Sequence, residues 1–89
     1  MKKINLAITG CLGRMGQQLI KSSKSNKVFK LVALTENKPF NKRISGIKIN
    51  LNTYQVFKKT DVIVDFTIPK CTLEILNIAV KLKKRLVIG

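Results

Sequence analysis

Residues 4–16 read INLAITGCLGRMG, an apolar run that ends on a glycine-rich turn. Gly10 stands where the run ends, and glycine readily adopts the tight-turn conformations that a Cβ disfavours. We therefore expect a strand at about 3–9, a turn at Gly10 and a helix at about 14–25. A second apolar run, predicted as a strand at about 28–35, follows and leads to Glu36. Strand, glycine turn, helix and strand in this order form a βαβ unit.

The turn has the properties of an anion site. Its backbone N–H groups and the positive end of the helix dipole point to one place. Gly16, one turn into the helix, allows the helix to lie close to the strand. Arg14 is disfavoured in the first helical turn unless an anion binds there. Glu36 follows Gly16 by about 20 residues, the distance at which an acidic residue accepts hydrogen bonds from a ribose. The spacing predicts a dinucleotide site.

The glycines follow G-x-x-G-x-x-G and not the commoner G-x-G-x-x-G. By itself this pattern also fits a strand-to-helix turn that binds no ligand. The flanking strands, the amphipathic helix and the position of Glu36 favour nucleotide binding.

Length and composition indicate one small domain, with 89 residues of which 45% are hydrophobic. We expect a cytoplasmic protein, because no long apolar run and no cleavable leader are present. Cys11 and Cys71 lack C-x-x-C spacing and the chain has no histidine, so no metal site is expected. Both cysteines lie near predicted helix N-termini. Moderate thiol reactivity is therefore one interpretation, and unreactive reduced thiols are the other.

The net charge is +14, with 18 Lys and Arg residues against 4 Asp and Glu residues. Such a charge is typical of nucleic-acid-binding proteins. The lysines, however, are spread over all predicted elements, and no helix-turn-helix, RNP or zinc-finger pattern is present. We interpret the charge as compositional, with no nucleic-acid or membrane partner. Its field would still attract an anionic dinucleotide.

The remaining elements follow from periodicity and turn signals. The helix at 14–25 is predicted to bury Met15, Leu19 and Ile20. A polar loop at 37–52 contains residues 47–49 as a short edge strand, and a short helix at about 53–59 would bury Val56 and Phe57.

Residues 61–66 form an apolar, β-branched run typical of a buried parallel strand. Pro69 suits the first turn of a helix that continues to about Lys83. The apolar face of that helix is predicted to contain Leu73, Leu76, Ala79, Val80 and Leu82. Residues 86–89 begin a fourth main strand. We therefore predict an α/β fold: a Rossmann-like parallel sheet with helices on both faces, truncated after the fourth main strand.

Two segments carry a resemblance that is more specific than the glycines. Residues 8–16 (ITGCLGRMG) and 64–69 (VDFTIP), with Thr72-Leu73 and the terminal VIG, resemble the 4-hydroxy-tetrahydrodipicolinate reductases (dihydrodipicolinate reductases) of bacterial lysine and diaminopimelate biosynthesis. The resemblance implies an NADPH- or NADH-dependent oxidoreductase that forms tetrahydrodipicolinate and is a homotetramer at full length. Residues 1–89 would be its N-terminal dinucleotide-binding domain, incomplete and without the C-terminal substrate domain. The chain alone would be inactive, with no catalytic residue.

The resemblance also implies which residues bind the cofactor. Those for the pyrophosphate are Gly10, Cys11, Leu12, Gly13, Arg14 and Met15. Glu36 would hold the adenosine ribose. Asn37 stands where the family often has an arginine for the 2′-phosphate, and Lys38 follows it, so use of both cofactors is expected.

At the nicotinamide end the resemblance implies Phe66 and Thr67, and Gly89 would open the family's G-T-T-G loop. Taken without the resemblance, Phe66 also fits a core aromatic residue and Thr67 a helix N-cap.

Two other functions fit parts of the pattern. One is the cofactor domain of another G-x-x-G-x-x-G enzyme, such as a semialdehyde or amino-acid dehydrogenase. The other is a non-catalytic nucleotide-binding module.

Overall fold

The computed structural model describes residues 3–67 and 69–89. Its elements in chain order are β1 (Ile4–Thr9), α1 (Arg14–Ser25), β2 (Phe29–Thr35), β3 (Arg43–Ile44), β4 (Ile47–Asn50), α2 (Tyr54–Phe57), β5 (Val62–Asp65), α3 (Pro69–Leu82) and β6 (Arg85–Ile88). Within these residues the strands form one sheet in the order β3-β4-β2-β1-β5-β6.

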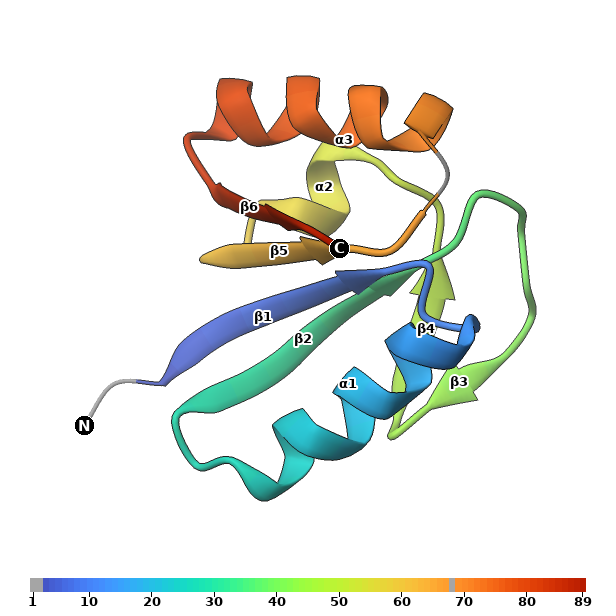
Figure 1. Cartoon of the computed structure of the whole chain (residues 1–89), viewed down its shortest axis with the longest axis vertical. Helices are drawn as coiled ribbons and strands as arrows, with labels where there is room; N and C mark the ends of the chain where they lie inside the picture. The colour runs from blue at the N-terminus through green and yellow to red at the C-terminus, as the bar shows by residue number, and fades with distance from the viewer. Residues whose placement is uncertain (1–2, 68) are drawn as a thin grey trace.

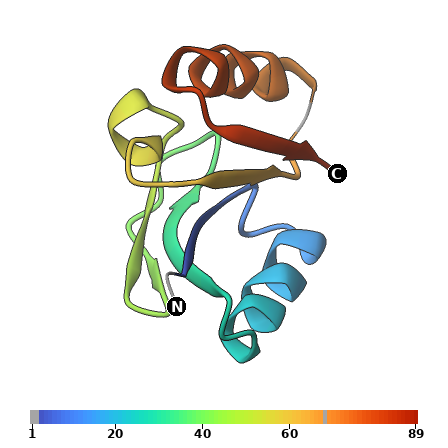
Figure 2. The same ribbon diagram turned by 90° about the vertical axis from the view of Figure 1, so that its left-hand side faces the viewer.

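The sheet is parallel except at one edge. β1 pairs in parallel with β2 and with β5, β2 pairs in parallel with β4, and β5 pairs in parallel with β6, whereas β3 is antiparallel to β4. Helix α1 covers one face, and α2 and α3 cover the other (Figures 1 and 2). The predicted Rossmann-like sheet with helices on both faces is confirmed.

The predicted strand at residues 47–49 is confirmed as β4, but its predicted position at the edge of the sheet is wrong. β4 pairs with β2 on one side and with β3 on the other, so β3 is the edge. Ser45 and Gly46 have φ values of 56° and 78°. Two consecutive positive φ values are typical of the tight hairpin turn that folds one strand back on the next. This turn brings Ile44 opposite Ile47.

The core has one layer on each face of the sheet. The layer under α2 and α3 is built from Ala7, Ala33, Phe57, Ile63, Cys71, Ile75, Ile78 and Ala79. The layer under α1 is built from Leu6, Ile8, Cys11, Ile20, Leu34 and Ile49. The strand residues alternate between the two layers because successive side chains point to opposite faces.

Two predicted helix faces are partly wrong. Met15 is 55% exposed, and α1 buries Gly16, Ile20 and Ser23. On α3 the exposed side chains include Leu73, Leu76 and Val80, while Cys71, Ile75, Ile78 and Ala79 are buried. Helix α3 is apolar on two sides, so periodicity alone did not decide which side faces the sheet.

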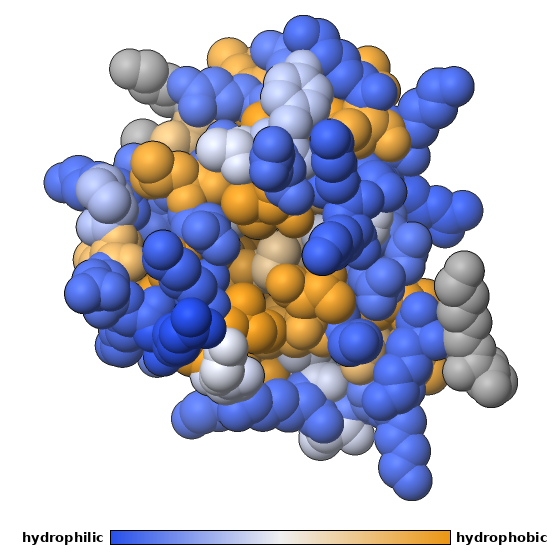
Figure 3. Space-filling model, turned by 180° about the vertical axis from the view of Figure 1, so that it is seen from behind, coloured by the Kyte–Doolittle hydropathy of each residue, from blue (hydrophilic) through white to orange (hydrophobic). Residues whose placement is uncertain are grey.

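Seen from behind, an apolar area lies in the middle of a largely hydrophilic face (Figure 3).

Gly16 fixes how closely α1 approaches the turn before it. A Cβ at this position would collide with the carbonyl oxygen of Gly10 and lie 2.9 Å from the Cα of Cys11. Both neighbours are backbone atoms and cannot rotate away. The predicted close packing of the helix at Gly16 is confirmed.

We expect Gly16→Ala to lower the free energy of unfolding by about 1–3 kcal/mol, because overpacking must displace backbone. Chemical denaturation measures the loss. Ser22→Ala, at an exposed position of the same helix, is the control and should change stability by less than about 0.5 kcal/mol. Equal stability of the two variants would contradict the packing argument.

Candidate functional site

The carboxyl ends of three neighbouring strands bring the predicted site segments together. Thr9 at the end of β1 is in register with Thr35 of β2 and with Asp65 of β5. The residues that follow these ends line a pocket of about 190 Å³, formed by Gly10, Gly13, Glu36, Asn37, Phe66 and Thr67. β2 and β5 lie on opposite sides of β1. A point at which the strand order reverses in this way is where open α/β sheets bind ligands.

Gly10 lies against the loop after β5. Its φ is 65°, and a Cβ there would be 2.8 Å from the carbonyl oxygen of Phe66. A side chain at this position would therefore be strained and would also push the two loops apart. The absence of a side chain keeps the turn and the β5 loop close together.

The backbone N–H groups of the turn divide into two sets. Those of Cys11, Leu12 and Gly13 donate to the Thr35 carbonyl (3.3 Å), the Glu36 carboxylate (2.7 Å) and the Gly10 carbonyl (3.1 Å).

The next three N–H groups, of residues 14–16 in the first turn of α1, have no acceptor in the described part of the chain. Within the predicted segment 10–15, Arg14 and Met15 are therefore the residues whose N–H groups can bind an anion.

Glu36 is held in place by the turn. Its Oε2 atom accepts the N–H of Leu12, and its own N–H donates to the Asn50 carbonyl at 2.9 Å. Among the described residues its second oxygen, Oε1, has no hydrogen bond. The carboxylate is thus oriented in advance and keeps an acceptor for a ligand hydroxyl.

A larger cavity adjoins Glu36. It has a volume of about 500 Å³ and is lined by Glu36, Asn37, Leu51, Asn52, Thr53, Cys71 and Glu74. The Oδ1 atom of Asn52 is buried with no hydrogen-bond partner in the described structure. Sequence reasoning missed residues 51–53. The strand predicted at residues 47–49 could have indicated them, because the carboxyl end of β4 lies at the same edge of the sheet as Glu36.

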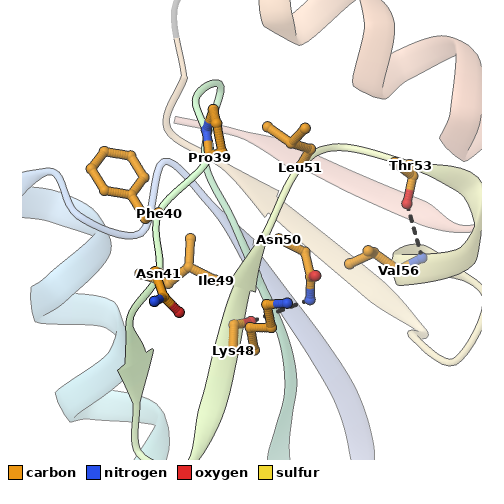
Figure 4. Close-up of a pocket in the computed structure, with 9 residues that line it drawn as sticks. All are labelled: Pro39, Phe40, Asn41, Lys48, Ile49, Asn50, Leu51, Thr53 and Val56. Carbon is orange, nitrogen blue, oxygen red and sulfur yellow. Dashed lines mark hydrogen bonds between the residues drawn. The ribbon is translucent and has the colours of Figure 1, made fainter.

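The loop after β2 shapes a further cavity of about 430 Å³ beside this one. Figure 4 shows Pro39 and Phe40 on the loop after β2, and Leu51 and Thr53 on the segment between β4 and α2. The Thr53 hydroxyl accepts the N–H of Val56 at 3.4 Å and caps α2. Helix α2 thus holds the segment that separates the two cavities.

Asp65 is a buried carboxylate that sequence reasoning did not single out. It is 1% exposed and accepts hydrogen bonds from the hydroxyls of Thr9, Thr67 and Thr72 and from the N–H of Thr67. Burial raises the pKa of Asp65, but these hydrogen bonds outweigh it and hold the pKa below its ordinary value. The carboxylate connects β1, the β5 loop and α3.

The other predicted residues of the nicotinamide end also meet. The N–H of Gly89 donates to the Asp65 carbonyl at 2.8 Å, and a Cβ on Gly89 would collide with the ring of Phe66. Phe66 is only partly buried and lines the pocket, which does not fit a core aromatic residue. Thr67 directs its hydroxyl to Asp65. Lys38 is exposed and lines neither cavity beside Glu36.

The cysteines do not support thiol chemistry. Cys11 is fully buried, and burial, with a smaller contribution from the Glu36 carboxylate, raises its pKa to about 11. The interpretation of Cys11 as a moderately reactive thiol is therefore wrong. Cys71 is also buried. The described residues contain no cluster of His, Cys, Asp or Glu that could hold a metal ion. Nor does any described helix have the length and hydropathy to cross a membrane.

Together, the fold and the site define a dinucleotide-binding domain of the Rossmann type. The chain belongs to the dihydrodipicolinate reductase family, because a family model described as "Dihydrodipicolinate reductase, N-terminus" matches residues 4–89.

Three known proteins illustrate the relationship. The chain is 76% identical over 89 residues to the 4-hydroxy-tetrahydrodipicolinate reductase of Pelagibacter ubique (strain HTCC1062), covering 100% of this chain and 34% of that protein. The structure of dipicolinate-bound dihydrodipicolinate reductase from Paenisporosarcina sp. TG-14 has a TM-score of 0.85 and 27% identity, over 99% of this chain and 37% of that one.

Aspartate semialdehyde dehydrogenase with NADP from Candida albicans has a TM-score of 0.77 at 14% identity, over 99% of this chain and 30% of that one, and shares the fold alone. The chain spans about a third of the length of the reductases it matches.

We expect Asp65→Asn to lower the free energy of unfolding at about pH 7 by roughly 2–4 kcal/mol, because hydrogen bonds to a buried charge are lost. The folded pKa of Asp65 lies below its ordinary value of 3.8. Its stabilisation is therefore complete above that value and is lost as the pH falls through the folded pKa. Urea denaturation between about pH 7 and pH 3 should show the difference from the parent shrinking in acid.

Asp61→Asn is the matched control, since Asp61 is exposed and accepts one amide N–H, that of Asn5. It should cost less than about 1 kcal/mol. If the effect of Asp65→Asn were as small as that of the control, or did not depend on pH, the described role of the carboxylate would be wrong.

Proposed function

We propose that this chain is the NAD(P)H-binding part of a reductase that converts 4-hydroxy-tetrahydrodipicolinate to tetrahydrodipicolinate in lysine (diaminopimelate) biosynthesis. The observation that carries the proposal is one pocket in which Gly13 at the N-terminus of α1, the oriented carboxylate of Glu36 and the Phe66–Thr67 loop meet. Membership in the reductase family supplies the reaction. Because the chain spans about a third of its relatives, the reaction is proposed for the whole protein.

The residues present fit a dinucleotide. The N–H groups of Arg14 and Met15 would bind the pyrophosphate, and the free Oε1 of Glu36 would accept from the adenosine ribose. The adenine would enter the cavity beside Glu36. The missing side chain of Gly10 lets the Phe66–Thr67 loop lie against the turn, so that both border the same pocket.

When bound, the cofactor supplies the hydride, and this chain supplies its orientation and electrostatic environment. The proposed nicotinamide end lies at Phe66, Thr67 and Gly89. No residue of the chain is proposed to transfer a proton to the substrate. From the family resemblance we further propose a C-terminal substrate domain, a homotetramer and a cytoplasmic location for the whole protein.

Both cofactors are proposed to bind. The Glu36 carboxylate opposes a 2′-phosphate, and Asn37 beside it is neutral, whereas Lys38 and the other lysines of the following loop attract one. These effects oppose each other. Direct titration should therefore give less than about a hundredfold preference between NADH and NADPH.

We expect Glu36→Gln to weaken NADH binding by about tenfold, because the single carbonyl oxygen of Gln can accept from the Leu12 N–H or from the ribose but not from both, and the charge is lost. NADPH binding should weaken less, since the repulsion of its 2′-phosphate is also removed. Calorimetric titration of both cofactors measures the two changes.

Asp61→Asn is the control: it also removes one negative charge, and Asp61 is exposed before β5 and lines neither cavity beside Glu36. It should change either affinity by less than about threefold. Equal effects of the two variants would mean that the loss of charge alone weakens binding, and that Glu36 has no ribose contact.

A hybrid protein tests the reaction. This chain should replace the matching third of the Pelagibacter ubique reductase and retain 4-hydroxy-tetrahydrodipicolinate reductase activity, because 76% of the residues are identical. A folded hybrid that binds NADH but does not reduce this substrate would contradict the proposed reaction.

Titration with a DNA duplex at about 50 mM and 200 mM salt tests the alternative that the chain binds nucleic acid. Steeply salt-dependent DNA binding without dinucleotide binding would favour a nucleic-acid-binding module.

A further inference from the structure

Thr67 stands between the buried carboxylate of Asp65 and the pocket. It is one of the residues that line the pocket. Its hydroxyl donates to Oδ1 of Asp65 at 2.5 Å, and its backbone N–H donates to the same oxygen at 3.0 Å. Two hydrogen bonds to one atom fix both the loop and the side chain of Thr67.

The proton of the Thr67 hydroxyl is engaged in the hydrogen bond to Asp65. A threonine hydroxyl has one proton and two lone pairs, and an ionised carboxylate can only accept. The Thr72 hydroxyl also gives its proton to Asp65, at Oδ2. The Oγ1 atoms of Thr67 and Thr72 are 3.4 Å apart, with both protons directed to the carboxylate. Towards a ligand in the pocket, Oγ1 of Thr67 can therefore only accept a hydrogen bond.

The order of the strands decides which part of a dinucleotide reaches Thr67. The acidic residue that meets the adenosine ribose follows β2, and the pyrophosphate lies at α1 directly after β1. β5 is on the other side of β1 from β2. The half of the cofactor beyond the pyrophosphate therefore extends over the end of β5, where Phe66 and Thr67 lie. That half ends in a nicotinamide ring, whose carboxamide amine is a hydrogen-bond donor.

We propose that Oγ1 of Thr67 accepts a hydrogen bond from the carboxamide amine of the nicotinamide ring, and that Asp65 is the positioning residue that keeps this hydroxyl an acceptor. The inference rests on the proposed function, because it takes NAD(P)H as the ligand. It adds a specificity determinant: the site selects a ring substituent that carries an N–H donor. Asp65 acts through Thr67 and makes no contact with the cofactor.

Ring analogues test the proposal on the 89-residue chain. The reduced 3-acetylpyridine dinucleotide has a methyl group in place of the amine, whereas the thionicotinamide dinucleotide keeps the amine. We expect the parent chain to bind the acetylpyridine analogue about tenfold more weakly than NADH, and the thionicotinamide analogue within about threefold of NADH.

Variants of Thr67 and Asp65 separate this contact from a structural role. Thr67→Val keeps the shape but removes the acceptor, and should bind NADH and the acetylpyridine analogue equally. Thr67→Ser keeps the hydroxyl and should discriminate as the parent does. Asp65→Ala removes the acceptor of the Thr67 hydroxyl proton, which is then free to point towards the ligand, and should lose most of the discrimination. A merely structural role would weaken all ligands alike and leave the ratio unchanged.

The outcomes are distinct. Failure of the parent chain to bind NADH would remove the proposed function and this inference with it. NADH binding without discrimination, or discrimination that survives in Thr67→Val, would overturn the inference and leave the proposed function intact. Unchanged discrimination in Asp65→Ala would overturn the positioning role. Circular dichroism of each variant checks folding, and the same variants in the hybrid reductase give the same ratios if an isolated variant unfolds.

Discussion

The site depends on the close contact of the Gly10 backbone with the backbone of two neighbouring segments. The carbonyl of Gly10 faces Gly16 of α1, and its Cα faces the carbonyl of Phe66. A side chain at residue 10 or 16 would separate the turn from the β5 loop or from the helix. Because neither residue has a Cβ, the N-terminus of α1, the end of β2 and the end of β5 converge on one pocket.

Two carboxylates hold this arrangement, and neither has a cationic partner in the part of the chain that the structure describes. Glu36 binds a backbone N–H of the turn, and Asp65 binds the hydroxyls of three threonines and one N–H. In a chain with a net charge of +14, ion pairs would be easy to form. Neutral donors orient each carboxylate instead. The positive charge of the Lys and Arg side chains is then not used in ion pairs and can attract an anion. One carboxylate faces the adenosine end of the proposed ligand, and the other lies behind its nicotinamide end.

The predictions succeeded where the signal was local and failed where it depended on packing. The glycines and the apolar run predicted β1 and α1 correctly. A turn with positive φ and a closely packed helix each require glycine, and these glycines lie close together in the sequence. The exposure of Leu73 and Val80 was not predictable, since α3 has apolar residues on both sides. The β3–β4 hairpin was missed, because β3 has two residues and is too short to show an alternating pattern in the sequence.

The sequence by itself determined the class of fold and the family, since both rest on short segments whose residues are close together in the chain. Only the tertiary structure decided which N–H groups of the turn remain free, which residues of β4 reach the cavity, and what Asp65 does. Thr9, Asp65 and Thr72 belong to three different elements. Hydrogen bonds among them depend on strand register and helix placement, which follow from burial of the whole core and not from any local pattern.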